Sequence, residues 1–266
     1  MLHLACDVHT HTIASRHAYS TVEENVYAAA KQGFELLGVA DHFSSMIYPQ
    51  SPVGVDMRDY QQFINFSVWP EVWHGVRLLH GCEADIVDLD GHLYGWDMPL
   101  EYGMVAPTSD PAPTLQEMVF GRCDYVIASV HGKQWAEGAT REQITRMYVR
   151  ALEQPEVLIL GHVGRSGLDF DVDEVCAAAR DLGKMIEIND SSLYGHYSFI
   201  ERCRYIAERC AAIGCMVAVS SDAHISYDVA RLDHARMLLE GISFPESLIA
   251  TRDAKTFLHA WEHAGM

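Results

Sequence analysis

The feature that most restricts the fold of this chain is the repeated alternation of short apolar segments with amphipathic helical patterns. The apolar segments are rich in Val, Ile and Leu and lack strict alternation, which is typical of parallel strands buried on both faces. Helical patterns separate most of them, so we expect an α/β fold and a closed or nearly closed (β/α) barrel. The predicted strands cover residues 4–8, 36–40, 77–83, 124–130, 157–162, 185–189 and 216–221, and the predicted helices cover residues 21–33, 140–154, 171–183, 198–214, 228–241 and 253–264.

Residues 1–266 are expected to form a single domain, because this length suits one barrel and no shift in composition marks a boundary. The least regular part is residues 85–120. A turn is predicted at residues 88–92, and the prolines that follow, Pro99, Pro107, Pro111 and Pro113, predict an irregular excursion near the barrel mouth.

Histidines and carboxylates recur where the predicted strands end. The carboxyl ends of parallel barrel strands converge on one face, which is where such barrels carry their active sites. Any one of these histidines could be an ordinary core or surface residue, but the same coincidence at six strand ends indicates a metal site with several ions. The candidate ligands are His9, His11, His17, His42, Glu83, His131, His162, Asp222 and His224.

Nine candidate ligands exceed what one or two tetrahedral sites require. Three metal ions with about three protein ligands each, one carboxylate bridging two of them, would use the set and leave positions open for water and substrate. Imidazole and carboxylate ligands without thiolate suit zinc, manganese or iron. The seven cysteines are scattered without a CxxC pair, which is typical of reduced thiols in a reducing compartment.

At these positions the chain resembles the PHP (polymerase and histidinol phosphatase) superfamily and, within it, the trinuclear YcdX-type phosphatases. The resemblance runs from Asp7 to about His224 and rests on motifs that include HAYST at residues 17–21 and SDAH at 221–224. The other matching stretches are DVHTH at 7–11, ADH at 40–42, GCEA at 81–84, ASVH at 128–131, GH at 161–162 and EIN at 187–189.

The resemblance implies a distorted (β/α)7 TIM-like barrel and a division of the ligands among three divalent ions, with zinc the first choice and manganese or iron as alternatives. One ion would be held by His9, His11, Glu83 and Asp222, a second by Glu83, His131 and His162, and a third by His17, His42 and His224. Asp7 and Asp41 each precede a ligand, so they are expected to hydrogen-bond an imidazole, to face solvent or to act as caps. Asp190 stands where the family often has an amide.

The resemblance and the ligand count together predict a metal-dependent phosphatase. A hydroxide bridging two metals would attack a small phosphomonoester, and the third metal would bind phosphoryl oxygens. The residues expected to take part in catalysis are Glu83, Asp222 and His224, with Arg16 and Arg165 contacting phosphate. Asp222 or His224 could also protonate the leaving oxygen, although both are better explained as ligands.

The charge of the chain restricts its partners. Nineteen basic and 37 acidic residues give a net charge of −18, which disfavours nucleic acid and anionic membranes. No transmembrane span and no leader are expected, so the predicted location is the cytoplasm. Three alternatives stay open: a phosphodiesterase or exonuclease, an amidohydrolase-type metallohydrolase, and a non-catalytic metal-binding regulatory module. The oligomeric state is not predicted.

Overall fold

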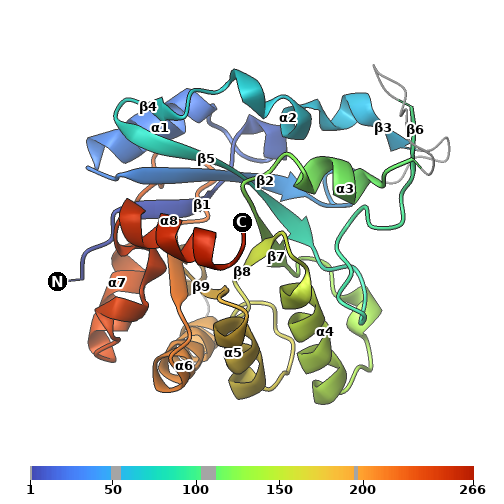
Figure 1. Cartoon of the computed structure of the whole chain (residues 1–266). Coiled ribbons are helices and arrows are strands. Elements are labelled where there is room, and N and C mark those ends of the chain that lie inside the picture. Colours follow the sequence, from blue (N-terminus) through green and yellow to red (C-terminus); the bar gives the residue numbers. More distant parts are fainter. Residues whose placement is uncertain (1, 49–54, 103–111, 195–196) are drawn as a thin grey trace.

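Seven parallel strands form the centre of the protein, as the apolar segments predict (Figure 1). The structure is a computed structural model and describes residues 2–48, 55–102, 112–194 and 197–266. Each strand hydrogen-bonds to the next in sheet order, and all six pairings are parallel. In that order the strands are β1 (Cys6–Thr10), β2 (Leu36–Phe43), β5 (Val76–Asp85), β7 (Tyr125–Ser129), β8 (Val157–Leu160), β9 (Met185–Asn189) and β10 (Val217–Ser220).

The sheet curls until its first and last strands meet. Just beyond β10, the amide of Asp222 donates to the carbonyl oxygen of His9 at 2.8 Å, and the amide of His11 donates to that of Ala223 at 2.9 Å. The strands therefore form a nearly closed, distorted barrel. This arrangement confirms the predicted fold class.

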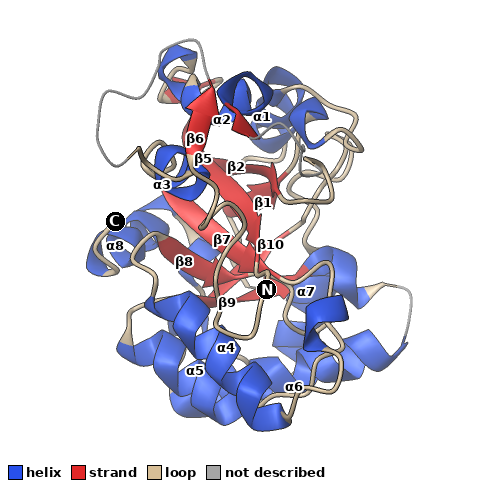
Figure 2. Ribbon diagram, turned by 90° about the vertical axis from the view of Figure 1, so that its right-hand side faces the viewer, coloured by secondary structure: helices blue, strands red, loops and turns tan. Residues whose placement is uncertain are grey.

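Helices lie around the outside of the barrel, and α4, α5 and α6 stand side by side in both ribbon views (Figure 2). A capping box begins α1, in which Thr21 and Glu24 satisfy each other's backbone amides. The helices are α1 (Val22–Lys31), α2 (Gln61–Ile64), α3 (Leu115–Phe120), α4 (Arg141–Glu153), α5 (Val172–Asp181), α6 (Tyr197–Ile213), α7 (Asp233–Gly241) and α8 (Ala254–His263).

Tyr125 fills the barrel interior and explains two glycines in neighbouring strands. Its hydroxyl donates to the carbonyl oxygen of Val8 at 2.5 Å. A Cβ at Gly38 would lie 1.9 Å from that hydroxyl oxygen, and one at Gly81 would lie 2.7 Å from the ring. Residues at the amino ends of the strands pack with Phe257 of α8, which closes this end of the barrel.

Several predicted boundaries are wrong by a few residues. The first strand begins at Cys6, where its pairing with Leu36 starts, and β2 and β5 continue to Phe43 and Asp85, past their predicted ends. The helix predicted from residue 228 begins at Asp233, because hydrogen bonds such as that from the amide of Arg231 to the carbonyl of Asp228 form a turn there instead.

The stretch over residues 85–120 is more regular than expected. The predicted turn is present, since Gly91 has φ +79° and the amide of Val87 donates to the carbonyl of His92 at 2.9 Å. Strand β6 (Leu100–Tyr102) pairs in parallel with β3 (Val55–Asp56), and Thr114 caps α3. Short regular elements therefore lie within the predicted excursion, and they are too short for a periodic signal in the sequence. Residues 103–111, which include Pro107 and Pro111, lie outside the described part.

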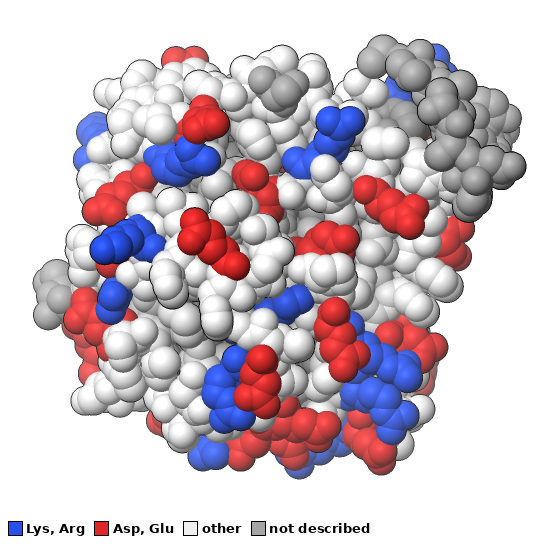
Figure 3. Space-filling model, viewed as in Figure 1, with Lys and Arg blue, Asp and Glu red and all other residues white. Residues whose placement is uncertain are grey.

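Acidic and basic side chains are interspersed on the face shown in Figure 3.

A short strand, β4 (Val72–Trp73), pairs antiparallel with β5 at the sheet margin. Within the described ranges, every helix is too short or too polar to cross a lipid bilayer.

Candidate metal centre

The structure brings the predicted ligands together at the carboxyl ends of the barrel strands. They come from strands or from the loops that follow them, because parallel strands in one barrel end on the same face. His9, His42 and Glu83 lie within β1, β2 and β5. Loops after the strands supply His11, His17, His131, His162, Asp222 and His224.

Glu83 lies at the centre of this cluster and is fully buried. Its Oε1 is 2.7 Å from His162 Nε2 and 3.4 Å from Nε2 of both His9 and His131. Its Oε2 is 2.7 Å from His42 Nδ1 and 3.6 Å from His11 Nε2. One carboxylate therefore faces five imidazoles, as a bridging ligand would.

Asp222 forms a second acidic point beside Glu83. One carboxylate oxygen lies 3.1 Å from His11 Nε2 and 3.7 Å from His9 Nε2. The other oxygen accepts a hydrogen bond from Arg165 at 2.7 Å. Asp222 has φ +56°, an unfavourable backbone region for a residue with a side chain, so the loop holds this carboxylate in place at a cost.

The outer part of the cluster consists of imidazoles. His17 Nε2 lies 3.2 Å from His42 Nε2 and 3.0 Å from His224 Nε2. His17 is exposed and the His224 side chain is 30% exposed, whereas His9, His11 and Glu83 are fully buried. The centre therefore has a dry inner part with carboxylates and an outer part that solvent reaches.

Three sets of donor atoms are close enough to share an ion. Within each set the donor atoms lie within 4.8 Å of one another, and the sets are His9–His11–Glu83, His42–Glu83–His131 and His11–His42–His224. These sets overlap the division that the family resemblance implies without reproducing it, since His42 stands with Glu83 as well as with His224.

Unsatisfied polar atoms in the cluster fit a metal. Four buried side-chain atoms that could bind a metal have no hydrogen bond within the described part of the chain. They are His9 Nε2, His42 Nδ1, His162 Nδ1 and Glu83 Oε2. His42 Nδ1 and Glu83 Oε2 lie only 2.7 Å apart, yet they are not aligned as donor and acceptor. Two atoms that lie close together without forming a hydrogen bond are typical of ligands that share a cation. Each buried polar atom left unpaired costs about 1–3 kcal/mol of folding free energy.

Two groups of the inner part, Glu83 and His11, are held in the protonation state that binds metal ions. Burial alone would raise the pKa of Glu83, but the imidazoles of His131, His9 and His42 hold that pKa well below its ordinary value. Burial and the neighbouring His42 lower the pKa of His11 well below its ordinary value. A charged carboxylate and a neutral imidazole are the forms that bind metal ions.

Buried acceptors fix the outward nitrogens of several imidazoles. Glu187 Oε1 lies 2.7 Å from His9 Nδ1, and its Oε2 accepts from the backbone amide of His162 at 2.6 Å. Asp85 Oδ1 lies 2.6 Å from His131 Nδ1. A carboxylate on Nδ1 sets the tautomer that leaves Nε2 free for a metal.

We did not predict these roles for Glu187 and Asp85. Asp85 lies two residues after Glu83 on β5, so alternation along the strand was the available signal for it, whereas β9 holds no predicted ligand beside Glu187. The hydroxyl of Ser15 was also missed; it lies 3.1 Å from His11 Nδ1 and donates to Asp41 at 2.6 Å.

Asp7 and Asp41 support the centre through other groups. Asp41 reaches His11 through Ser15 and also binds the amide of Thr12 at 2.7 Å. Asp7 accepts hydrogen bonds from the backbone amide and hydroxyl of Ser221, next to Asp222. Direct hydrogen bonding of either aspartate to an imidazole was one of the open expectations, and among the described contacts neither makes it.

The two predicted phosphate-binding arginines differ in position. Arg165 donates to Asp222 and, at 2.8 Å, to the hydroxyl of Ser191. With His224 these three residues line a pocket of about 280 Å³ beside the cluster. Arg16 instead lies over the ring of Tyr48, 4.9 Å from its centroid, with φ +62°.

Asp190, the family departure, is directed towards α7. It accepts from the amide of Ala235 at 2.7 Å and lies 3.0 Å from His234 Nδ1. His92, another histidine of the chain, stacks on Trp96 and lies 2.8 Å from Asp88 through its Nδ1.

Comparison with known proteins identifies the family. The PHP domain matches residues 7–193, which include seven of the nine candidate ligands. The chain belongs to the PHP domain family. A protein of Caldanaerobacter subterraneus subsp. tengcongensis named as a probable phosphatase is 37% identical over 249 residues, which are 93% of this chain and 87% of that protein. A probable phosphatase of Acetivibrio thermocellus is 35% identical over 94% of this chain and 92% of its own length.

Solved structures of the family show the same fold. Histidinol phosphate phosphatase from Lactococcus lactis subsp. lactis, solved with zinc, L-histidinol and phosphate, aligns with a TM-score of 0.55 at 17% identity. The alignment covers 91% of this PHP chain and 94% of that protein. At this identity the likeness establishes the barrel architecture.

Proposed function

We propose that this PHP protein is a metal-dependent phosphatase that hydrolyses a small phosphomonoester. The observation that carries the proposal is the convergence of imidazoles and two carboxylates on one buried patch with unsatisfied donor atoms. Relatives named as probable phosphatases, similar over more than nine-tenths of this chain, support the same activity. We further propose that residues 1–266 form one domain.

The proposed ligands are the nine residues at the strand ends, sufficient for three divalent ions. Zinc is the first choice because the Lactococcus lactis phosphatase was solved with zinc, and manganese and iron are alternatives that the same donor atoms suit. Glu83 would bridge two ions, and Asp222 would complete the inner part with His9 and His11. The remaining proposed ligands are His17, His42, His131, His162 and His224. Bound divalent ions would activate a water molecule and neutralise charge on the phosphoryl group.

The chain's own residues would bind and orient the ester. Arg165 reaches into the 280 Å³ pocket, where its guanidinium could pair with phosphoryl oxygens while Asp222 and Ser191 hold it in place. Arg16, stacked on Tyr48 and adjacent to His17, is the second proposed phosphate contact. Glu187 and Asp85 would keep His9 and His131 oriented during turnover.

One preparation of purified protein tests the function. Metal content is measured by elemental analysis, and hydrolysis is measured on p-nitrophenyl phosphate, bis(p-nitrophenyl) phosphate and a p-nitroanilide. We expect three ions per chain and turnover of the monoester in clear excess over the other two. Preference for the diester would favour a phosphodiesterase, preference for the anilide an amidohydrolase, and no turnover by the metal-loaded protein would favour a regulatory module.

A further inference from the structure

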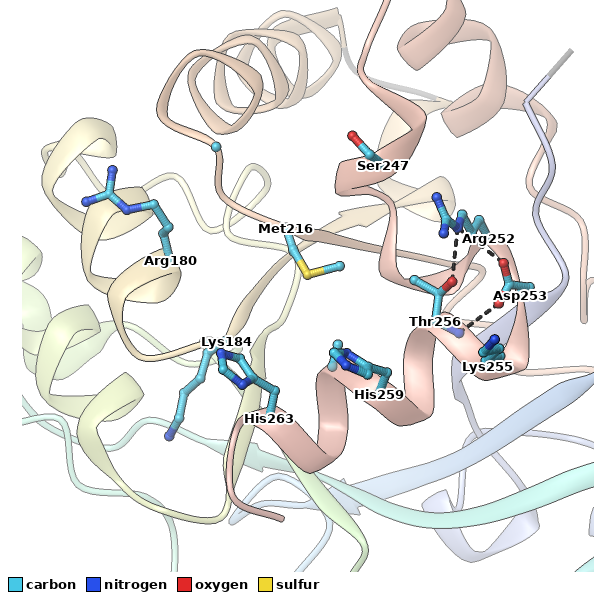
Figure 4. Close-up of a pocket in the computed structure, with 13 residues that line it drawn as sticks. Arg180, Lys184, Met216, Ser247, Arg252, Asp253, Lys255, Thr256, His259 and His263 are labelled. Carbon is cyan, nitrogen blue, oxygen red and sulfur yellow. Dashed lines mark hydrogen bonds and ion pairs between the residues drawn. The ribbon is translucent and has the colours of Figure 1, made fainter.

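A second pocket lies at the amino ends of the strands, on the other side of the barrel from the metal centre (Figure 4). It has a volume of about 520 Å³ and forms where α8 meets the turns that lead into β9 and β10. None of the nine candidate metal ligands lines it, so it is a separate site.

One face of α8 gives this pocket three nitrogen-bearing side chains. Lys255, His259 and His263 are spaced four residues apart, so they share a face of the helix, and all three line the pocket. Each is exposed, and none has a hydrogen-bond or ion-pair partner among the described residues. Their donor groups are therefore available to a ligand.

Two arginines add to the nitrogen-bearing side chains that line the pocket. The guanidinium of Arg180 pairs with Asp181, the next residue, and that of Arg252 pairs with Asp253. Both are ion pairs between chain neighbours in contact with solvent, which contribute little to stability, so a bound anion could compete for either guanidinium.

The pocket departs from the charge of the whole chain. Its lining has four cationic residues, the fourth being Lys184, and one carboxylate, that of Asp253. The chain as a whole has 19 basic and 37 acidic residues. The Asp253 carboxylate is already engaged, because it accepts from the amide of Thr256 at 2.7 Å as the cap of α8. The ammonium of Lys184 donates to the carbonyl oxygens of Leu152 and Gln154, so it contributes charge and no direct contact.

We propose that this pocket binds a small phosphorylated anion. Lys255, His259 and His263 would contact the phosphate group, and Arg180 and Arg252, which lie on opposite sides of the pocket in Figure 4, would add positive charge at its rim. The volume exceeds that of inorganic phosphate and falls in the range of small-molecule sites, so an organic part of the ligand can rest on Met216 and Ala260. Among the described residues, the groups of side chains that could hold a metal ion all lie in the other cluster, so we expect this site to bind its ligand without chemistry.

The test follows the two histidines in the metal-loaded protein, with inorganic phosphate as the probe. Protein labelled with ¹⁵N-histidine is titrated with phosphate at constant ionic strength, and His259→Gln and His263→Gln identify the two resonances. We expect both resonances to shift and saturate. Lys255→Glu should raise the dissociation constant for phosphate, measured from these two resonances, by about tenfold or more. The substitution replaces an attractive charge by a repulsive one.

Lys31→Glu is the matched control, because it makes the same charge change at an exposed lysine on α1. It should leave the dissociation constant within twofold, and Lys255→Glu should leave basal hydrolysis of p-nitrophenyl phosphate unchanged. The proposal is overturned if the two resonances stay fixed or shift without saturating. Equal weakening by both lysine variants would also overturn it, because that result indicates only general charge attraction.

Discussion

At the carboxyl end of the barrel, buried atoms of His9, His42, Glu83 and His162 have no hydrogen bond within the described part of the chain. At the amino end, Lys184 and Trp261 have their polar groups satisfied. The ammonium of Lys184 donates to two carbonyl oxygens, and Trp261 Nε1 donates to the carbonyl of Asp124 at 2.6 Å. The protein itself therefore satisfies the polar groups of Lys184 and Trp261, whereas it leaves these four atoms of the metal centre unpaired.

The difference separates function from stability. An unpaired buried donor or acceptor destabilises the fold unless a ligand satisfies it, so the carboxyl end is arranged for something that is not protein. The satisfied groups at the amino end hold α8 and the chain before β9 against the barrel. Changes at the carboxyl end should therefore alter metal content and activity, and changes to these satisfied groups at the amino end should alter stability without altering metal content or hydrolysis.

Replacing the central carboxylate should give the largest effect. Glu83→Gln keeps the shape but removes the charge that faces five imidazoles, so we expect kcat/KM for p-nitrophenyl phosphate to fall by about a thousandfold or more, with loss of bound metal. Elemental analysis and circular dichroism accompany the assay. Unchanged hydrolysis with metal retained would contradict the catalytic role of this centre.

Removing an anchoring carboxylate should have the next largest effect. Glu187→Gln weakens the hold on His9 Nδ1 without touching the face that meets the metal, so metal affinity should fall by about 10–100-fold. Competition with a chromogenic chelator measures that affinity. Asp85→Asn makes the same change behind His131, and Asp173→Asn, in an exposed ion pair with Arg209, is the control that should leave affinity unchanged.

Metal removal should destabilise the fold through the carboxyl end. Ligand at 100 times its dissociation constant stabilises a protein by about 2.7 kcal/mol per site, which corresponds to roughly 5–10 °C in Tm for a chain of this size. Scanning calorimetry before and after dialysis against EDTA measures the shift. The Tm of Glu83→Gln should fall less on EDTA treatment than that of the wild type. An equal fall in Tm would mean that the stabilising ion binds at a site without Glu83.

Breaking a contact at the amino end should affect stability alone. Trp261→Phe removes the half-buried hydrogen bond to the carbonyl of Asp124, so the free energy of unfolding should fall by about 0.5–1.5 kcal/mol. Urea denaturation measures the change, and kcat/KM should stay at the wild-type value. If kcat/KM of Trp261→Phe fell as far as that of Glu83→Gln, the amino end would also be needed for activity, which would contradict the distinction between the two ends.

The last effect is a change in the pH dependence of stability, expected from the titration of Lys184. Burial lowers the pKa of Lys184 to about 8 from an ordinary value of 10.5. Between these pH values the unfolded chain binds more protons than the folded one, so this lysine makes stability rise as pH rises from 8 towards 10.5. Lys184→Met should flatten that rise in urea denaturation, whereas Lys255→Met, at an exposed lysine of the same end, should leave its slope unchanged.

The fold and the candidate ligands were predictable for physical reasons. Strands buried on both faces are continuously apolar, so the positions of β1, β8 and β9 could be predicted from the sequence. Parallel strands end on a common face, so the residues that follow them could be predicted to lie together. The short elements β6 and α3 could not, because three or six residues carry too little periodicity and α3 depends on its cap at Thr114.

The sequence by itself determined the alternating architecture, the set of imidazoles and carboxylates at the strand ends and the resemblance to the PHP family, because these depend on residue type and local spacing. Only the tertiary structure decided that Glu83 stands among five imidazoles, that Glu187 joins His9 to the amide of His162, and that a basic pocket forms beneath α8. Those contacts join residues distant in the chain, and their distances depend on how the barrel closes.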